Sequence, residues 1–178
     1  FGKGKPALLH GVTGSGKTEI YLKLARETLA RGKNVLYLVP EIALSRQLED
    51  RISELFPEEL LVFHSGETMA RKREIASVLR SCGEAGRRCL VLGTRSAIFL
   101  PHKDLGLVII DEENDTSYKQ DSPAPRYNGR ETAIMMARIF AADVILGSAT
   151  PSLESLYNCS VGRYGLVTLS KRYYDAAD

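Results

Sequence analysis

The sequence predicts an α/β fold in which a mostly parallel sheet carries helices on both faces. Short apolar runs rich in Val, Leu and Ile alternate along the chain with stretches of helical spacing. Uninterrupted apolar runs are typical of strands that are buried on both faces, and their alternation with helices is typical of parallel sheets. A chain of 178 residues is long enough for one such domain with a substantial core.

The apolar runs predict six strands, at residues 6–10, 34–40, 60–64, 89–93, 106–111 and 143–149. Helical spacing predicts four helices between them, at residues 18–31, 43–56, 69–81 and 130–140. Residues 114–128, rich in Asp, Ser, Pro and Tyr, show neither pattern, and a loop of this length in a compact domain is usually functional or disordered. Every apolar run is far shorter than the roughly 18 residues of a membrane span, so we expect no membrane partner.

The carboxyl ends of the predicted strands mark the functional edge of the sheet, because ligands of open α/β sheets bind there. Polar, distinctive segments begin at five of these ends, namely Gly11, Pro40, Gly93, Asp111 and Ser148.

Residues 11–18, GVTGSGKT, match the phosphate-loop pattern G-x-x-x-x-G-K-[ST] between a predicted strand and a predicted helix. The glycines allow backbone N–H groups to approach phosphate oxygens, and the helix adds its positive N-terminal end. Lys17 would reach the β- and γ-phosphates, and the Thr18 hydroxyl would bind Mg²⁺. The predicted nucleotide-binding residues are Gly11, Thr13, Gly14, Ser15, Gly16, Lys17 and Thr18.

Two adjacent carboxylates supply the acidic partner that such a site needs. Asp111 ends an apolar strand and would hold Mg²⁺, while Glu112 would orient or deprotonate the attacking water. With Lys17, they are the predicted catalytic residues. A GTP-dependent switch would require an Asn/Thr-Lys-x-Asp sequence, and the nearest approach, residues 118–121 (YKQD), has the wrong first residue and does not end a strand. We therefore predict ATP, and its product ADP, as the nucleotide.

The three cysteines, Cys82, Cys89 and Cys159, are too few and too irregularly spaced for a disulfide framework or a zinc site. We expect free thiols and no zinc. The net charge of +2 is weak evidence about partners. The sequence does not begin with Met, and we expect residues 1–178 to be one lobe of a larger protein.

Several motifs then resemble one family, in one order along residues 8–172. These are LVPEIALSRQL (38–48), FHSG (63–66), GTRSAIFLP (93–101), IIDEENDTSYKQ (109–120), PRYNGRE (125–131) and GSATPSLES (147–155). Together they resemble the first motor lobe of the primosomal replication-restart helicases of superfamily 2. GTRSA and DEExDxSYKQ are the specific motifs, because the phosphate loop alone would not distinguish this family.

The resemblance implies a RecA-like lobe of an ATP-dependent, 3′-to-5′ DNA helicase that acts in replication restart in the bacterial cytoplasm, at the nucleoid. It implies single-stranded and forked DNA, a second helicase lobe of the same chain, primosome proteins and single-strand-binding proteins as partners. The family's second lobe with its arginine finger, its zinc modules and its N-terminal DNA-binding domain are missing from this sequence. We therefore expect this chain to bind nucleotide but to hydrolyse it poorly.

The same resemblance implies two groups of DNA-binding residues. Ser45, Thr94, Arg95 and Ser96 would contact the DNA backbone, without sequence preference. An aromatic-rich loop that senses DNA would contain Tyr118, Lys119, Arg126 and Tyr127. Structural alternatives stay open: Ser45 on a helix surface, Arg95 in a surface ion pair, and tyrosines that simply pack against the lobe.

One departure from the family concerns the acidic motif, which usually ends in His and here ends in Asn114. Asn114 could still hydrogen-bond to Ser148 or Thr150 and so couple the nucleotide site to DNA binding, but without a positive charge. Two alternatives remain open. One is another superfamily 2 DNA translocase, for branch migration or repair, and the other is a nucleotide-gated DNA-binding module without hydrolysis.

Overall fold

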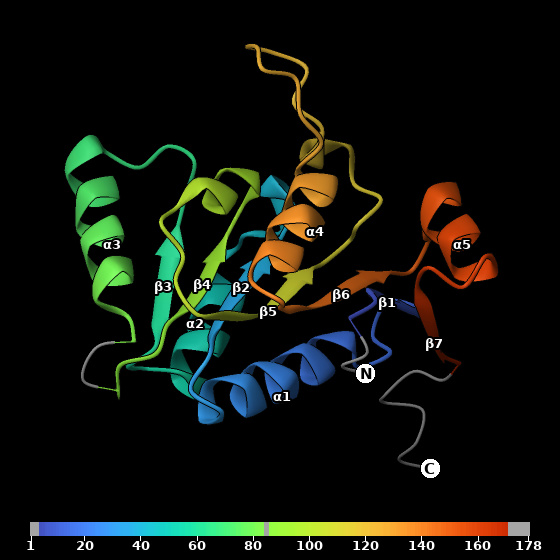
Figure 1. Cartoon of the computed structure of the whole chain (residues 1–178), viewed down its shortest axis with the longest axis horizontal. Helices are drawn as coiled ribbons and strands as arrows, with labels where there is room; N and C mark the ends of the chain where they lie inside the picture. The colour runs from blue at the N-terminus through green and yellow to red at the C-terminus, as the bar shows by residue number, and fades with distance from the viewer. Residues whose placement is uncertain (1–3, 84–85, 171–178) are drawn as a thin grey trace.

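The computed structural model describes residues 4–83 and 86–170, and Figure 1 shows their arrangement. Within these ranges the chain forms a seven-stranded sheet in the order β3-β4-β2-β5-β6-β1-β7, and every pair of neighbours is parallel. This confirms the predicted α/β fold. The strands are β1 (Ala7–Gly11), β2 (Asn34–Leu38), β3 (Leu60–Phe63), β4 (Leu90–Gly93), β5 (Leu105–Ile110), β6 (Asp143–Ser148) and β7 (Gly165–Leu169).

Helices cover both faces of the sheet, with α1 and α2 on one face and α3 and α4 on the other (Figure 1). The helices are α1 (Lys17–Ala30), α2 (Arg46–Leu55), α3 (Met69–Ser81), α4 (Gly129–Ile139) and α5 (Leu153–Ser160), with short 3₁₀ turns η1 (Glu41–Ala43), η3 (Arg95–Phe99) and η4 (Thr116–Tyr118). Among the described residues, no helix is long and apolar enough to cross a membrane.

The two faces explain why the strands are apolar without interruption. In β2, Val35 and Tyr37 pack with the buried residues of α1 and α2, whereas Leu36 and Leu38 pack with those of α3 and α4. Because successive side chains of a strand point to opposite faces, a strand covered on both sides needs apolar residues at every position.

The six predicted strands and four predicted helices are all present, with small shifts at their ends. The helix predicted from residue 43 begins at Arg46, because Ser45 caps it: the Ser45 hydroxyl accepts a hydrogen bond from the Leu48 N–H at 3.3 Å. Helix α5 and strand β7 were not predicted. Both expose apolar side chains, and β7 is an edge strand that is exposed over most of its length, so neither has the pattern of a buried element.

The expectation of free thiols is wrong for Cys82 and Cys89, which form a disulfide between the end of α3 and the start of β4. Their Cα atoms lie 6.4 Å apart, within the distance that a disulfide spans. Within the described part of the chain, Cys159 is the free cysteine.

Gly147 in β6 provides a test of the packing of α1 against the sheet. A Cβ atom at Gly147 would lie 1.5 Å from the hydroxyl of Tyr21, a fully buried side chain of α1, whereas no described atom lies within 4 Å of a Cβ at Gly66. We predict that Gly147→Ala lowers the free energy of unfolding by about 1–3 kcal/mol. The matched control Gly66→Ala should change it by less than about 0.5 kcal/mol. Urea denaturation measures both, and equal stability of the two variants would contradict the packing described here.

Candidate active site

The phosphate loop connects β1 to α1 at the carboxyl edge of the sheet. Gly14 and Gly16 have φ angles of 79° and 86°, in the left-handed region that glycine adopts without strain. Lys17 is buried, and its Nζ donates to the carbonyl oxygen of Gly11 at 2.7 Å and to that of Val12 at 3.4 Å. The ammonium group therefore lies over the loop, bound to the loop's own carbonyl groups.

The loop leaves little room beneath it. The hydroxyl of Ser15 is buried and has no hydrogen-bond partner among the described residues. A Cβ atom at Gly11 would lie 2.5 Å from this hydroxyl and 3.0 Å from the Cβ of Leu169, so a side chain at position 11 would displace Ser15 or the end of β7.

Asp111 follows β5 and faces the phosphate loop from across β6. Its Oδ1 accepts hydrogen bonds from the Tyr21 hydroxyl at 3.1 Å and from the Glu112 N–H at 3.0 Å. Burial raises the pKa of Asp111, and the bond from Tyr21, the bond from Glu112 and the charge of Lys17 oppose this shift. Tyr21 is itself held by an edge-to-face contact with Tyr37, with 5.6 Å between the ring centroids.

Glu112 has a φ angle of 45°, an uncommon backbone conformation for a residue with a side chain and one that often marks functional sites. Partial burial and the neighbouring Asp111 carboxylate raise the pKa of Glu112. A higher pKa makes a carboxylate a better proton acceptor near neutral pH.

Asp111, Glu112 and part of the phosphate loop line one cavity of about 240 Å³. Its lining is Thr13, Gly14, Gly16, Lys17, Thr18, Glu19, Arg51, Asp111 and Glu112. Gly11 and Ser15, which were also predicted to bind the nucleotide, do not line it. The motifs did not identify Glu19 and Arg51, which form an exposed ion pair at its rim.

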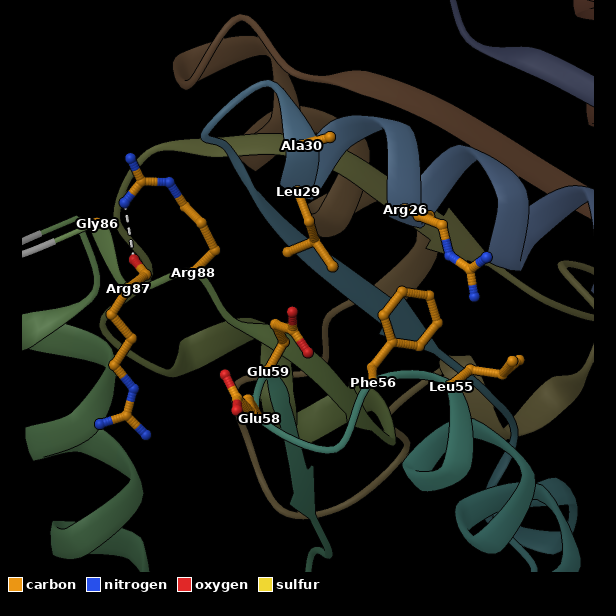
Figure 2. Close-up of a pocket in the computed structure, with 10 residues that line it drawn as sticks. All are labelled: Arg26, Leu29, Ala30, Leu55, Phe56, Glu58, Glu59, Gly86, Arg87 and Arg88. Atoms are coloured by element: carbon orange, nitrogen blue, oxygen red, sulfur yellow. Dashed lines mark hydrogen bonds between the residues drawn. The ribbon is translucent and has the colours of Figure 1, made fainter.

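A larger hollow of about 410 Å³ lies at the opposite edge, beside the starts of β3 and β4 (Figure 2). Arg26, Arg87 and Arg88 line it together with Glu58 and Glu59, over the apolar side chains of Leu29, Leu55 and Phe56. None of the predicted nucleotide or DNA residues lines this hollow.

Asn114 bonds to Ser148, the last residue of β6, and to Thr150, just after this strand. Its Oδ1 accepts from the Ser148 hydroxyl at 2.7 Å, and its Nδ2 donates to the Thr150 hydroxyl at 3.2 Å. Both hydrogen bonds that the sequence suggested for Asn114 are therefore present, while the coupling of nucleotide state to DNA binding stays a prediction.

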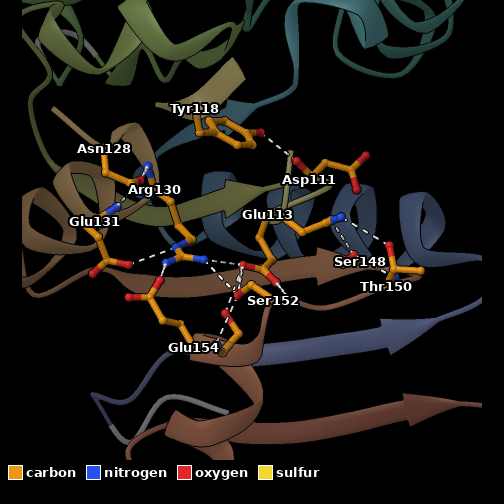
Figure 3. A network of polar contacts seen from close by, with 12 residues as sticks. Asp111, Glu113, Tyr118, Asn128, Arg130, Glu131, Ser148, Thr150, Ser152 and Glu154 are labelled. Atoms are coloured by element: carbon orange, nitrogen blue, oxygen red, sulfur yellow. Dashed lines mark hydrogen bonds and ion pairs between the residues drawn. The ribbon is translucent and has the colours of Figure 1, made fainter. Parts of the chain in front are cut away.

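A buried ion pair beside these residues was not found from the sequence. Arg130 in the first turn of α4 donates to the Glu113 carboxylate at 2.8 Å, and both side chains are almost completely buried (Figure 3). Both residues lie in motifs that carry the family resemblance, IIDEENDTSYKQ and PRYNGRE, but neither motif indicates that the two side chains pair. The one signal is that Glu113 is a third acidic residue beside the two catalytic candidates, where a buried carboxylate would need a cation.

Three of the side chains predicted to bind DNA cannot reach it in this conformation. Tyr118 is 2% exposed and its hydroxyl donates to the Asp111 carbonyl oxygen at 2.6 Å, so its ring cannot stack on a base and the packing alternative holds. Thr94 is 3% exposed. The hydroxyl groups of Thr94 and Ser96 are both buried without a hydrogen-bond partner among the described residues, so neither is available to a phosphate group in this conformation.

The other predicted DNA-binding residues are at least partly accessible. Ser45, Lys119 and Arg126 are exposed. Arg95 donates to the Ser117 carbonyl oxygen at 3.0 Å and lies 5.5 Å from the ring centroid of Tyr127. Neither contact is the surface ion pair that was the structural alternative for Arg95.

Phe99, which the sequence reading did not single out, extends this aromatic cluster. Its ring lies edge-on to Tyr127 with 5.0 Å between the centroids, and the residue is 63% exposed. Lys119, Arg126 and the Arg95–Tyr127–Phe99 cluster thus offer exposed cations and aromatic rings near the same edge of the sheet.

The fold and this site define a RecA-like lobe, and comparison with known proteins agrees. The pattern of the DEAD/DEAH box helicase family matches residues 1–159, so the chain belongs to this family. It is 49% identical over 169 residues to the replication restart protein PriA of Rickettsia felis and 46% identical over 168 residues to that of Bacillus subtilis. These alignments cover 95% and 94% of this chain but 25% and 20% of the relatives, so the chain spans a quarter or less of their length.

A solved structure of RecG bound to a three-way DNA junction is also similar, with a TM-score of 0.61 and 26% identity. The match covers 92% of this chain and 21% of the RecG chain. The resemblance to the replication-restart helicases and the RecA-like fold are thereby confirmed.

The buried carboxylate of Asp111 allows a prediction about stability and pH. Because burial raises its pKa, the ionised form destabilises the fold above that pKa, and this cost disappears as the pH falls below the unfolded value of about 4. We predict that Asp111→Asn unfolds at a higher temperature than the wild type at pH 7, with a difference that shrinks toward pH 4. Thermal unfolding across this pH range measures it. A variant that is less stable at pH 7 would contradict the assignment of the shift to burial.

Proposed function

We propose that the chain is the ATP-binding motor lobe of an ATP-dependent DNA helicase that acts in replication restart. The observation that carries this proposal is the meeting of the phosphate loop with Asp111 and Glu112 around one cavity. The identity of nearly half with replication restart proteins over almost the whole chain supports the same assignment. The remainder of such a protein, including a second lobe, would lie outside residues 1–178.

The residues of the cavity suit a magnesium nucleotide. Backbone N–H groups of the glycine-rich loop and the start of α1 would bind phosphate oxygens. Lys17 would exchange its bonds to Gly11 and Val12 for bonds to the β- and γ-phosphates. The Thr18 hydroxyl and Asp111 would hold Mg²⁺, which neutralises charge on the phosphate groups. Oxygen ligands of this kind are the ones Mg²⁺ prefers.

Glu112 would orient the attacking water and accept its proton. Its raised pKa and its position on the cavity wall support this role. An arginine finger from a second lobe would complete the site, since such fingers increase phosphoryl-transfer rates by about 10³–10⁵ in GTPases. The chain alone would therefore hydrolyse ATP slowly.

Single-stranded DNA would bind along the carboxyl edge, through Ser45, Lys119, Arg126 and the Arg95–Tyr127–Phe99 cluster. Cations bind phosphate groups and aromatic rings stack on bases, and both contacts tolerate any sequence. Forked DNA, a 3′-to-5′ polarity, primosome and single-strand-binding proteins, and a place at the bacterial nucleoid belong to this proposal through the relatives. The similarity to RecG on a three-way junction favours a translocase on junction DNA as the second candidate function.

The test is nucleotide binding and turnover with matched variants. We predict that the chain alone binds Mg–ATP, that its turnover stays below roughly 1 s⁻¹, and that Lys17→Ala abolishes binding while leaving the fold intact. Arg31→Ala, at the exposed C-terminal end of α1, is the matched control. Calorimetric titration and a phosphate-release assay measure both quantities.

In the full-length polypeptide, single-stranded DNA should accelerate phosphate release, and Lys17→Ala should abolish the acceleration. A chain that binds nucleotide but shows no DNA-stimulated release in the full-length protein would instead be a nucleotide-gated binding module. Comparing forked with three-way-junction DNA as the activator separates the two motor functions.

A further inference from the structure

A hairpin projects from the carboxyl edge of the sheet, just before α4 (Figure 1). It spans residues 119–128, closed by a bridge between Lys119 and Asn128 and by a hydrogen bond from the Gln120 N–H to the Tyr127 carbonyl oxygen at 2.9 Å. Its tip, residues 121–126, is exposed throughout. The tip therefore packs little against the lobe, and its placement depends on what holds the two ends of the hairpin.

The first end is held by Tyr118, immediately before the hairpin. Its buried hydroxyl donates to the carbonyl oxygen of Asp111, the residue proposed to hold Mg²⁺. One leg of the hairpin is thus bonded directly to the nucleotide site.

The second end is held by Arg130, two residues after the hairpin. Asn128 caps α4 by accepting the N–H groups of Arg130 and Glu131, so the hairpin leads into the helix without a flexible joint. The Arg130 guanidinium then donates to Glu113 at 2.8 Å and to the Ser152 hydroxyl at 2.9 Å (Figure 3). It also donates to Glu131 at 2.9 Å and contacts Glu154.

Glu113 is the buried member of this group. Its carboxylate accepts from four donors: Arg130 at 2.8 Å, the Ser152 N–H at 2.7 Å, the Ser152 hydroxyl at 3.0 Å and the Ser155 hydroxyl at 3.0 Å. Glu131 and Glu154 are 54% and 75% exposed, so water screens their attraction to Arg130. The Glu113–Arg130 contact is therefore the one that fixes the guanidinium.

A buried charge that leaves its partner is strongly disfavoured. A displacement of the acidic segment at Asp111 and Glu112 must therefore carry Glu113, and with it Arg130 and the start of α4. The hydroxyl groups of Ser152 and Ser155 donate to the Glu113 carboxylate. The start of α5, which follows Ser148 and Thr150, would therefore move together with Glu113 and Arg130.

We propose that Glu113 and Arg130 are a positioning pair that transmits changes at the nucleotide site to the hairpin of residues 119–128. The inference rests on the proposed function, since it takes residues 11–18 and Asp111 as the site where Mg–nucleotide binds. The forked guanidinium is required, because its rigid plane donates to the buried Glu113 carboxylate and to the Ser152 hydroxyl in one orientation, whereas a lysine ammonium is a point charge on a flexible stem.

The test is hydrogen exchange of the hairpin, measured by mass spectrometry with and without Mg²⁺–AMP-PNP. In the wild type, the nucleotide should slow exchange of amides in residues 119–128 by about fivefold or more, the size of an ordinary coupling between sites. Arg130→Lys and Glu113→Gln should each remove more than half of this effect while changing the nucleotide Kd by less than about twofold. The remaining protection depends on the hydrogen bond from the Tyr118 hydroxyl to Asp111. Arg130→Lys combined with Tyr118→Phe should therefore abolish the protection.

Arg138→Lys, an exposed change in the last turn of the same helix, is the matched control and should keep the full effect. If a single variant fails to fold, as judged by circular dichroism, the neutral pair Glu113→Gln/Arg130→Gln takes its place. Full nucleotide-dependent protection in these variants would overturn the inference, as would wild-type protein that binds the nucleotide without any change in the hairpin. Wild-type protein that binds no Mg²⁺–AMP-PNP would instead overturn the proposed function, and the inference with it.

Discussion

The parallel direction of all strands in the described sheet is the constraint on which the candidate site depends. Since parallel strands end at one edge, the phosphate loop after β1, the acidic segment after β5 and Ser148 at the end of β6 are brought together although they are far apart in the chain. Strand β6 lies between β1 and β5. Gly147 in this strand leaves the space through which Tyr21 reaches Asp111, so the site is built across three adjacent strands.

The acidic segment Asp111–Asn114 distributes its four side chains among four different surroundings. Asp111 accepts from Tyr21, Glu112 lines the cavity, Glu113 pairs with Arg130 and Asn114 bonds to Ser148 and Thr150. The positive φ angle at Glu112 turns the chain at this point. Consecutive residues thereby line the cavity at the phosphate loop, pair with the start of α4 and bond to Ser148 and Thr150 at the end of β6.

Much of this arrangement could be predicted because it follows local rules. A strand buried on two faces must be apolar throughout, and a phosphate loop must be rich in glycine, so both leave a sequence signature. The partners of polar side chains are set by tertiary contacts instead. Nothing in the sequence near Arg130 indicates that it lies against Glu113, 17 positions earlier, or that Tyr118 faces Asp111 rather than solvent.

Two elements at the margin of the sheet, α5 and β7, could not be predicted from the sequence for a related reason. The apolar side chains of α5 and β7 are largely exposed, so these elements do not show the pattern of a buried face. Thr94 was misjudged because a polar residue after a strand is normally accessible, whereas here its side chain is buried at the start of η3. Motif position thus indicated the correct edge of the sheet but not which side chains reach its surface.

The central claim is that residues 11–18 and the acidic segment bind one magnesium nucleotide. The most direct measurement is a crystal structure of the chain with Mg²⁺ and a non-hydrolysable ATP analogue. The account predicts phosphate groups against the phosphate loop, Lys17 Nζ moved from the Gly11 carbonyl to the β- and γ-phosphates, and Mg²⁺ between Thr18 and Asp111. A nucleotide bound elsewhere, or a Lys17 still bonded to Gly11 beside a bound nucleotide, would contradict it.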